Sequence, residues 1–595
     1  MVMTGVELSL AVLGLTAQLF VTAVHSYRFI STAQHLRRDA SIEFWKLRIQ
    51  EVRLKGWGRH WGADREEFEK FLEEEDLVED VRGILTQIQE LFADSKKLKE
   101  KYGLKIEGVA EPDTHEQQLL LSILRARNPD RPTLAQKFLW SLKDKQKFAS
   151  LVSDLKELND GLYCLLDASE RRSIGACNES DILRLTNDAV DCDDIQQACI
   201  VYRDEAAKDG SSQRRWLSPP YVDLINSTGA KKIAIEQSEI VVPPLGSSVP
   251  SHVTRDHERD PESVVGYIKQ SPTGLRILAE YRSQAALIEW KTIDEKNSYQ
   301  ALIAQRMENL ARLLEPASPK PSDFRVLNCL GYFRDKALPR YGYLFELPSS
   351  TVQQPPVSLH DLLSRGGPQE LLLDLGDRFT LARTLASSLL RLHECGWVHT
   401  SFRSESILFF FSEQAGSSSS TPQPCTKKPY ISGFGYSKPN DPAESTLEYS
   451  HPNRMHDIYR HPEIVKARGN PGASDAIRLQ QRHDLFSLGI ILLEIGLWEQ
   501  IKALWKEKYT PSAFLTKLLT GYVPRLGHKM GTIYRDVVSD LLNMHIEQHK
   551  STAEVASFLS MSRSEMPADE KKNQGKDLDE LDWWNVVVRL EKCKA

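Results

Sequence analysis

The stretch VHTSFRSESIL, residues Val398–Leu408, decides the fold of the second half of the chain. Other short segments stand in a fixed order on both sides of it. Before it come LIEWK at 287–291, FRVLNCLGYF at 324–333, YLFELP at 343–348 and SLHDLL at 358–363; after it come ISGFG at 431–435, YRHPE at 459–463 and HDLFSLG at 483–489. One segment alone would be weak evidence, but the whole ordered series is strong evidence for one known fold.

These segments resemble those of a protein kinase domain. Val398–Leu408 lines up with the catalytic-loop pattern H-R-D-L-K-P-E-N-I-L, and 431–435 lines up with the segment that ends in D-F-G. Residues 287–291 look like the third strand of the small lobe, with Lys291 as the phosphate-binding lysine, and a helix is expected at 298–314. The resemblance implies an α+β bilobal kinase-like domain over residues 261–560.

The residues that perform phosphoryl transfer in kinases are replaced here. A kinase needs a carboxylate to accept the substrate's proton, an Asn on one metal ion and an Asp on magnesium. The matching positions are Ser401, Ser406 and Gly433, and none of them can do this chemistry. Glu463 and Asp484, which support the fold in kinases, are retained. We therefore expect a pseudokinase with no catalytic residues and no metal site.

Nucleotide binding is left open by the sequence. Lys291 and Glu346 are the residues expected to contact ATP if it binds without catalysis, although a lysine at a strand end also has a purely structural interpretation. Counting back along the helix at 298–314 places Arg306, with Glu308 near it, where kinases carry the glutamate that pairs with the lysine. A glycine-rich phosphate loop is missing, since Gly266 and Gly274 lie too far apart to form it.

The first part of the chain begins with a strongly apolar stretch, Val6–Val24. It does not resemble a signal peptide, because no Lys or Arg precedes Arg28 and Glu7 lies where positive charge is expected. Its length is close to the minimum for a membrane span, about 18–20 residues. It is either a buried core helix or a core helix that can leave the fold and enter a bilayer. In the second case the membrane-active residues are Val6, Leu10, Leu13, Leu15 and Phe20.

Residues 1–205 have apolar side chains at helical spacing. One run extends from Ile42 to Trp57 and predicts a helix that ends near Gly56–Gly58. A second run covers Val78–Phe92, a third begins at Phe138 and continues towards Leu162, and two more helices are expected around 179–187 and 192–208. Helices with one apolar face must bury those faces together, which predicts an all-α helical bundle.

This region resembles the HeLo domain of fungal heterokaryon-incompatibility proteins, the HET-s/HET-S prion-inhibition and propagation family. The resemblance covers about residues 4–205. It rests on these segments: Gly5-Val6-Glu7 through Tyr27, 37–40 (RRDA), 47–49, 52–54, 56–58 (GWG) and 138–158. It implies a helical bundle whose N-terminal segment can leave the fold, self-associate and disrupt membranes to cause programmed cell death. It also implies a fungal origin.

The remaining segments set the domain limits. Residues 206–260 are rich in Pro, Ser, Gly and charge with little periodicity, which is typical of a linker or brace. Residues 561–595 read as a charged flexible segment followed by a closing helix. The predicted organisation is therefore multidomain: bundle at 1–205, linker at 206–260, kinase-like domain at 261–560 and the tail at 561–595.

Composition excludes some classes of protein. The formal net charge of −6 over 595 residues gives no support for nucleic-acid binding. The eight cysteines form no C-x-x-C pair, so zinc and thioredoxin-like sites are not indicated. Scattered reduced thiols are typical of a cytoplasmic protein.

Three hypotheses follow. In the first, the protein is a signalling and cell-death effector: the kinase-like domain restrains a membrane-active bundle until an upstream receptor or partner protein releases it. The expected partners are then membrane lipids at the plasma membrane and further copies of the chain. In the second, it is an atypical active kinase with a helical targeting domain. In the third, it is an interaction scaffold with no membrane activity.

Overall fold

The computed structural model describes most of the chain in separate ranges. They are residues 14–31, 40–63, 68–93, 95–107, 139–142, 144–186, 188–208, 221–238, 255–270, 276–293, 300–318, 320–349, 351–364, 373–412, 423–440, 454–468, 481–544 and 583–595. The chain divides into two compact units, Met1–Gly229 and Ala230–Ala595. The boundary lies inside helix α13 (Val222–Ser238), so part of the segment predicted as a linker is helical.

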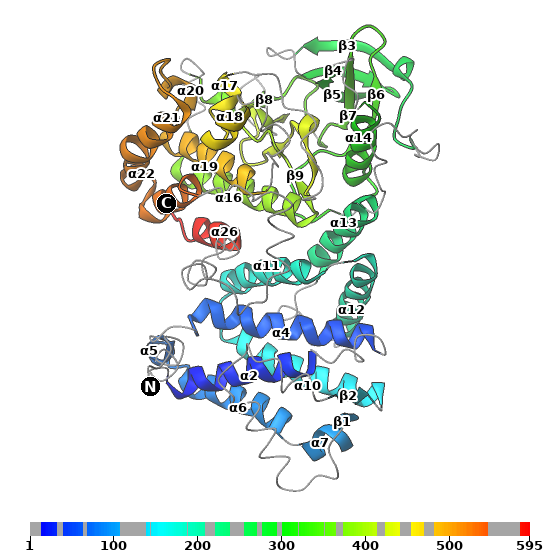
Figure 1. Cartoon of the computed structure of the whole chain (residues 1–595), viewed down its shortest axis with the longest axis vertical. Helices are drawn as coiled ribbons and strands as arrows, with labels where there is room; N and C mark the ends of the chain where they lie inside the picture. The colour runs from blue at the N-terminus through cyan, green and yellow to red at the C-terminus, as the bar shows by residue number, and fades with distance from the viewer. Residues whose placement is uncertain are drawn as a thin grey trace, which may run out of the picture. The chain divides into compact units, whose positions relative to one another are not determined.

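The first unit is helical, as predicted (Figure 1). Its other helices are α2 (Leu15–Ser31), α4 (Ser41–Trp61), α5 (Phe68–Glu74), α6 (Val78–Ala93), α7 (Ser95–Glu100), α10 (Lys145–Cys164), α11 (Ala168–Leu185) and α12 (Ala189–Lys208). Helix α4 is the central one, because α2, α10, α11 and α12 all pack against it. It can be central because most of its residues between Phe44 and Gly58 are buried, on several sides of the helix.

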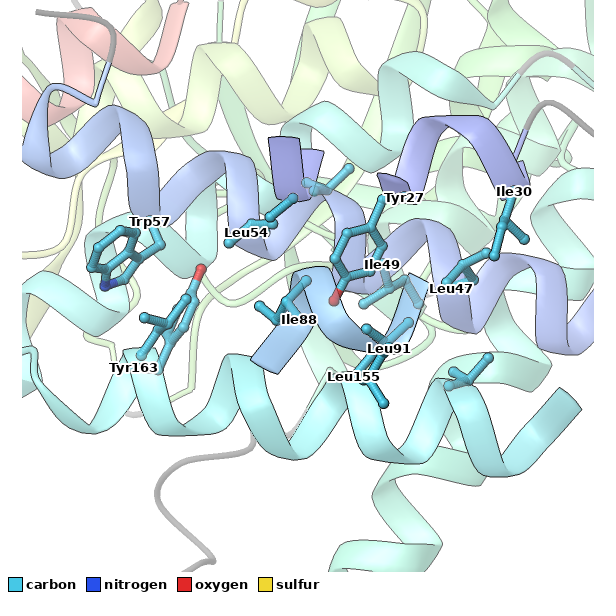
Figure 2. Close-up of a cluster of buried hydrophobic side chains, with 14 of the residues drawn as sticks. Tyr27, Ile30, Leu47, Ile49, Leu54, Trp57, Ile88, Leu91, Leu155 and Tyr163 are labelled. Carbon is cyan, nitrogen blue, oxygen red and sulfur yellow. The ribbon is translucent and has the colours of Figure 1, made fainter. Parts of the chain in front are cut away.

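Helices α2, α4, α6 and α10 share one hydrophobic core (Figure 2). Tyr27 and Ile30 of α2 meet side chains of the other three helices there, and both are almost completely buried. The core therefore holds the C-terminal part of α2 by contact with large apolar groups.

The predicted end of α4 was wrong by about one turn. The helix continues through Gly56 and Gly58 to Trp61 and ends at Gly62, whose left-handed φ of 67° stops it. Gly56 and Gly58 lie within the helix. Each leaves space for a side chain of a neighbouring helix. A Cβ at Gly58 would lie 2.0 Å from Phe20 of α2, and one at Gly56 would lie 2.0 Å from Asn178 of α11.

The unit also contains strands that the all-α prediction did not include. β1 (Leu104–Glu107) and β2 (Leu139–Leu142) form an antiparallel pair, so the helix predicted from Phe138 begins later than expected. Phe138 itself lies outside the described residues. Asp144 sets the true start of α10 by accepting hydrogen bonds from the backbone N–H groups of Gln146 and Lys147.

The second unit contains a five-stranded antiparallel sheet in the order β3-β4-β5-β7-β6 (Figure 1). The strands are β3 (Val264–Gln270), β4 (Arg276–Tyr281), β5 (Gln284–Thr292), β6 (Cys329–Arg334) and β7 (Arg340–Glu346). Helix α14 (Gln300–Leu314) packs against β6. Successive side chains of β5 point to opposite faces of the sheet. Ile288 and Trp290 lie in a small hydrophobic core on one face. Glu289 and Lys291 face the loop at 433–435.

The rest of this unit is mainly helical and is organised around α19 (Gln481–Leu497), in which every residue from His483 to Leu497 is buried. The other helices are α15 (Leu359–Leu362), α16 (Leu375–Glu394), α17 (Arg454–Asp457), α18 (Pro462–Arg468), α20 (Ile501–Leu504), α21 (Pro511–Lys517), α22 (Val523–Met530), α23 (Thr532–Leu542) and α26 (Trp583–Glu591). Helices α16, α22 and α23 contact α19 directly, and α26 packs on α16 and α23.

Short elements connect these helices. They are β8 (Val357–Ser358), β9 (Trp397–Val398), β10 (Ile407–Phe409), β11 (Phe411–Ser412), β12 (Gln423–Pro424), β13 (Tyr430–Ile431) and β14 (Lys438–Pro439), the 3-10 turns η1 (Pro261–Ser263), η3 (Ser404–Ser406) and η4 (Phe434–Tyr436), and the π turn η6 (Leu518–Tyr522). β10 lies between β13 and β8, which brings residues 398–408 and 431–435 together.

Candidate functional site

The three positions that the sequence aligned with the catalytic groups of kinases meet in the second unit. The Ser406 hydroxyl donates to the Ser401 carbonyl at 3.2 Å. Gly433 has a φ of 87°, and a Cβ there would lie 2.6 Å from the Ser406 hydroxyl oxygen. The Ser401 hydroxyl accepts from Arg403 at 2.6 Å. The cluster therefore holds hydroxyl groups and a backbone turn, without a carboxylate at any of the three positions.

Asp484 of α19 fixes the loop that carries Ser401. Its carboxylate accepts the backbone N–H groups of His399 at 2.6 Å and Thr400 at 2.8 Å, and the His393 imidazole at 2.9 Å. Burial alone would raise the pKa of Asp484, but its hydrogen bonds to His393 and the loop hold that pKa below its usual range. The Glu463 side chain, by contrast, is exposed and lies 3.9 Å from the His461 ring.

A buried ion pair lies beside this cluster. Arg276 of β4 and Glu289 of β5 are cross-strand partners, joined at 3.2 Å, and their side chains are only 8% and 7% exposed. Glu289 accepts the backbone N–H groups of Gly433 and Phe434 at about 3.0 Å. Arg276 donates to the Glu405 carbonyl and to the Ser432 hydroxyl. Two side chains of the sheet thus bind the loop segments that surround Ser406 and Gly433.

Lys291 and Glu346, the two predicted nucleotide contacts, are not brought together. The register of β5 and β7 places Lys291 opposite Tyr341 but Glu346 opposite Ala286, at the other end of the strand pair. Lys291 is buried, donates to the Gly435 carbonyl, and lies 5.0 Å from the centre of the Tyr436 ring. Glu346 is exposed and accepts from the Asn328 amide.

Glu308, which was predicted to lie near Lys291 together with Arg306, has a different partner in the structure. Glu308 of α14 contacts the His257 ring at 2.7 Å, and Glu315 contacts the same ring at 3.0 Å. The hydrogen bond to Glu308 raises the pKa of His257. Glu308 is therefore bonded to the segment that precedes the sheet.

In the first unit, the described part of the apolar stretch is helix α2. Leu15 is 59% exposed, and Phe20 is half-buried against the core. The other three predicted membrane-active residues, Val6, Leu10 and Leu13, lie outside the described residues. Within the described ranges, no helix combines the length and apolar character that a bilayer span requires.

The first half of α2 packs against aromatic rings of α4 and α5. Phe20 lies 6.4 Å from Trp57 of α4 and 6.5 Å from Phe68 of α5, and Trp57 and Phe68 are 6.2 Å apart, centre to centre. Gly58 leaves the space that the Phe20 ring occupies. The close approach of Phe20 to α4 therefore depends on the absence of a side chain at position 58.

The start of α2 is held by charged groups from two other helices. One carboxylate oxygen of Glu69 accepts the backbone N–H of Thr16 at 2.8 Å and the Thr16 hydroxyl at 2.8 Å. Arg82 of α6 donates to the same oxygen at 3.1 Å and to the Thr16 hydroxyl at 2.8 Å. The hydrogen bond from the Thr16 backbone holds the pKa of Glu69 below its ordinary value.

The comparisons with known proteins separate the two parts of the chain. Residues 8–195 match the HeLo family. The description of that family model is prion-inhibition and propagation. Residues 342–565 match a second model, described as a domain of unknown function (DUF7580), so the resemblance to protein kinases stays a prediction. No curated protein matches the chain.

The HeLo segment contains α2 and the residues that hold it in place. The motif Gly56-Trp57-Gly58 was noted in the sequence, and the structure explains it by the approach of α2 and α11 to α4. Glu69 and Arg82 were not identified as site residues, because charged positions on short amphipathic helices look like ordinary surface. The only signal is Gly14 before the helix, which has no role until Glu69 is placed beside it.

Proposed function

We propose that this protein is a cell-death effector of the fungal incompatibility type, in which the HeLo segment disrupts membranes and the C-terminal unit restrains it without phosphoryl transfer. The HeLo match supports a role related to fungal cell death. The match to a family of unknown function does not contradict a regulatory role for the second unit.

The observation that carries the proposal is the unusual composition of helix α2. The residues that it buries completely include small ones, Thr16, Ala17, Ala23 and Ser26, whereas the large apolar residue Leu15 is exposed. Leu19, Phe20, Val21 and Val24 are only partly buried, so large apolar side chains extend around much of α2, although Gln18 and Arg28 are exposed. Together with the apolar residues that precede it in the sequence, such a helix is suited to a bilayer once it leaves the bundle.

The proposal that the C-terminal unit lacks catalysis rests on the cluster at Ser401, Ser406 and Gly433. Without a base or carboxylate metal ligands, the electrostatic stabilisation on which phosphoryl transfer depends is missing. We further propose that Arg276 and Glu289 take the place of a nucleotide, because their hydrogen bonds already join the sheet to the loops at Glu405 and at Ser432–Gly433. ATP with magnesium at millimolar concentration should then leave the thermal unfolding temperature unchanged; a clear increase would contradict this part of the proposal.

The proposed partners follow from this mechanism. Membrane lipids and further copies of the chain would bind after release, and an upstream receptor or partner protein would act on the C-terminal unit. The protein would be cytoplasmic before release and would then be recruited to the plasma membrane.

Leakage of dye from anionic liposomes tests the proposal. The full chain is compared with a fragment, residues 1–238, that includes the whole of α13. We expect the fragment to cause leakage at concentrations at which the full chain does not. If neither does, the interpretation as an interaction scaffold is favoured. If the full chain transfers phosphate from ATP to a protein substrate, the interpretation as an atypical kinase is favoured.

A matched pair of variants shows whether α2 enters the bilayer. Leu15 and Val190 are both exposed apolar residues, at 59% and 68%, but Val190 lies on α12. An arginine at the centre of a membrane helix costs about 2.5–3.5 kcal/mol. Leu15→Arg should therefore reduce leakage by the fragment at least about 10-fold, whereas Val190→Arg should leave it unchanged. Equal effects of the two variants would rule out a specific role for α2.

A further inference from the structure

Three helices of the HeLo segment meet at one carboxylate oxygen. Glu69 belongs to α5, Thr16 to α2 and Arg82 to α6, and three hydrogen bonds converge on Glu69 Oε1. Arg82 also donates to Thr16 and, at 3.2 Å, to Glu79. This arrangement joins the first turn of α2 to two neighbouring helices through polar groups.

The Glu69 carboxylate also replaces the N-terminal cap that α2 does not supply from its own sequence. In the described residues, the first intrahelical bond runs from the Gln18 N–H to the Gly14 carbonyl. Thr16 therefore lies in the first turn of α2, where N–H groups have no partner within the helix. Glu69 accepts one of them and brings a negative charge to the helix N-terminus, where it is favourable.

Gly14 leaves the space in which the Glu69 carboxylate lies. A Cβ at position 14 would lie 1.6 Å from one carboxylate oxygen of Glu69 and 2.7 Å from the other. Neither oxygen can keep its position if residue 14 carries a side chain. The sequence therefore leaves a space beside the backbone that the carboxylate fills.

Much of the other polar bonding of α2 does not attach it to the bundle. Thr22 and Ser26 donate to carbonyls of Gln18 and Thr22 within the same helix. The attachment at Glu69 is also accessible, because the Glu69 and Arg82 side chains are 26% and 30% exposed. A partly exposed polar contact can open without first exposing the whole core.

We propose that Glu69, held by Arg82, is a latch that keeps the start of α2 in the bundle, and that opening this latch is the step that releases the N-terminal segment. That opening the latch leads to membrane disruption rests on the proposed function. That Glu69 holds the start of α2 in the bundle does not. Release then proceeds from the N-terminal end of α2, since Tyr27 and Ile30 at the other end lie deep in the core.

Hydrogen exchange of the full chain, read by mass spectrometry, tests the latch. Glu69→Ala should accelerate exchange in Leu15–Ser31 by about 10- to 100-fold, because it leaves the N–H and hydroxyl of the buried Thr16 without their acceptor. Arg82→Ala should accelerate it in the same segment, because it removes the group that holds the Glu69 carboxylate. Exchange in α10, Lys145–Cys164, should stay as in the unmodified protein. Should Glu69→Ala not fold, Glu69→Gln keeps the accepting oxygen and removes the charge, and a smaller acceleration in the same segment is expected.

Two control variants separate a latch from ordinary stabilisation. Arg82 also pairs with Glu79, whose side chain is 88% exposed. Glu79→Ala removes that pair and should not change hydrogen exchange in α2. Leu151→Ala weakens the core from α10 and should accelerate exchange in α2 and α10 together. If Glu69→Ala behaves like Leu151→Ala, or leaves α2 unchanged, the latch is disproved.

Leakage measured on the same full-length variants distinguishes failure of the latch from failure of the proposed function. We expect Glu69→Ala and Arg82→Ala to cause leakage of anionic liposomes at concentrations about 10-fold lower than the unmodified chain. Faster exchange in α2 without any leakage would support the latch and contradict the membrane function. Leakage by the 1–238 fragment without an effect of Glu69→Ala on exchange or leakage would contradict the latch alone.

Discussion

Glu494 is a carboxyl group buried inside helix α19. One of its oxygens accepts the Tyr459 hydroxyl and the Ile501 backbone N–H, both at 2.8 Å. The other has no hydrogen-bond partner in the part of the chain that the structure describes. Burial raises the pKa of Glu494 to about 8. The folded protein therefore keeps a proton that the unfolded chain loses above about pH 4.5.

The free energy of unfolding should therefore fall as pH rises from about 4.5 to 8, because the folded state binds more protons than the unfolded state in that range. Glu494→Gln keeps the accepting oxygen and cannot ionise, so we expect it to flatten this part of the profile and to stabilise the protein most at pH 8. Urea unfolding at several pH values measures the effect. Glu507→Gln, an exposed substitution on the same unit, is the control and should leave the profile unchanged.

At the residue scale, the sequence predicts which positions lie together better than it predicts which side chains bond to them. Ser401, Ser406 and Gly433 were identified from their order along the chain, and they do lie together. Arg276 and Glu289 were not identified, because a strand residue reveals its partner only when the register is known. Glu69 was missed for the same physical reason: its three contacts come from helices that a single sequence does not place side by side.

At the scale of helices and strands, the glycines of the HeLo segment have opposite expected effects. Gly58 of α4 faces the Phe20 ring, whereas a Cβ at Gly83 of α6 would meet nothing within 4 Å. Gly58→Ala should destabilise the protein by about 1–3 kcal/mol through overpacking. Gly83→Ala should stabilise it by about 0.5–1 kcal/mol, because alanine favours the helix. Urea midpoints measure both, and a stabilising Gly58→Ala would show that Phe20 can move away at no cost.

Contacts with residues distant in sequence explain why the ends of two elements were hard to predict. Gly56 and Gly58 look like a helix end, yet α4 continues because neighbouring helices need the space that these glycines leave. Near Phe138 the apolar spacing suits a helix, but Leu139–Leu142 forms a strand paired with β1. A partner distant in sequence decided the second case, and Asp144 then sets where α10 starts. Long periodic runs such as Val78–Phe92 were predicted correctly because they depend only on local spacing.

At the scale of the whole molecule, the chain contains two compact units, each with buried apolar residues of its own. Calorimetry should then show two unfolding transitions rather than one. Leu151 of α10 and Leu493 of α19 are both completely buried, one in each unit. Substitution of either by Ala should cost about 2–5 kcal/mol and should lower one transition only. A shift of both transitions by either variant would mean that the units unfold as one.

The Leu493→Ala variant also tests whether the C-terminal unit restrains the HeLo segment. It alters no residue of the first unit, so any gain in membrane activity must come from loss of restraint. If the folded C-terminal unit provides that restraint, lowering its stability by about 2–5 kcal/mol increases the fraction in which it is unfolded by at least an order of magnitude. Leakage by the full-length variant should then approach that of the 1–238 fragment as the temperature nears the lowered transition. Leakage that stays at the level of the unmodified chain, while the transition has clearly moved, would show that the second unit does not hold the HeLo segment in check.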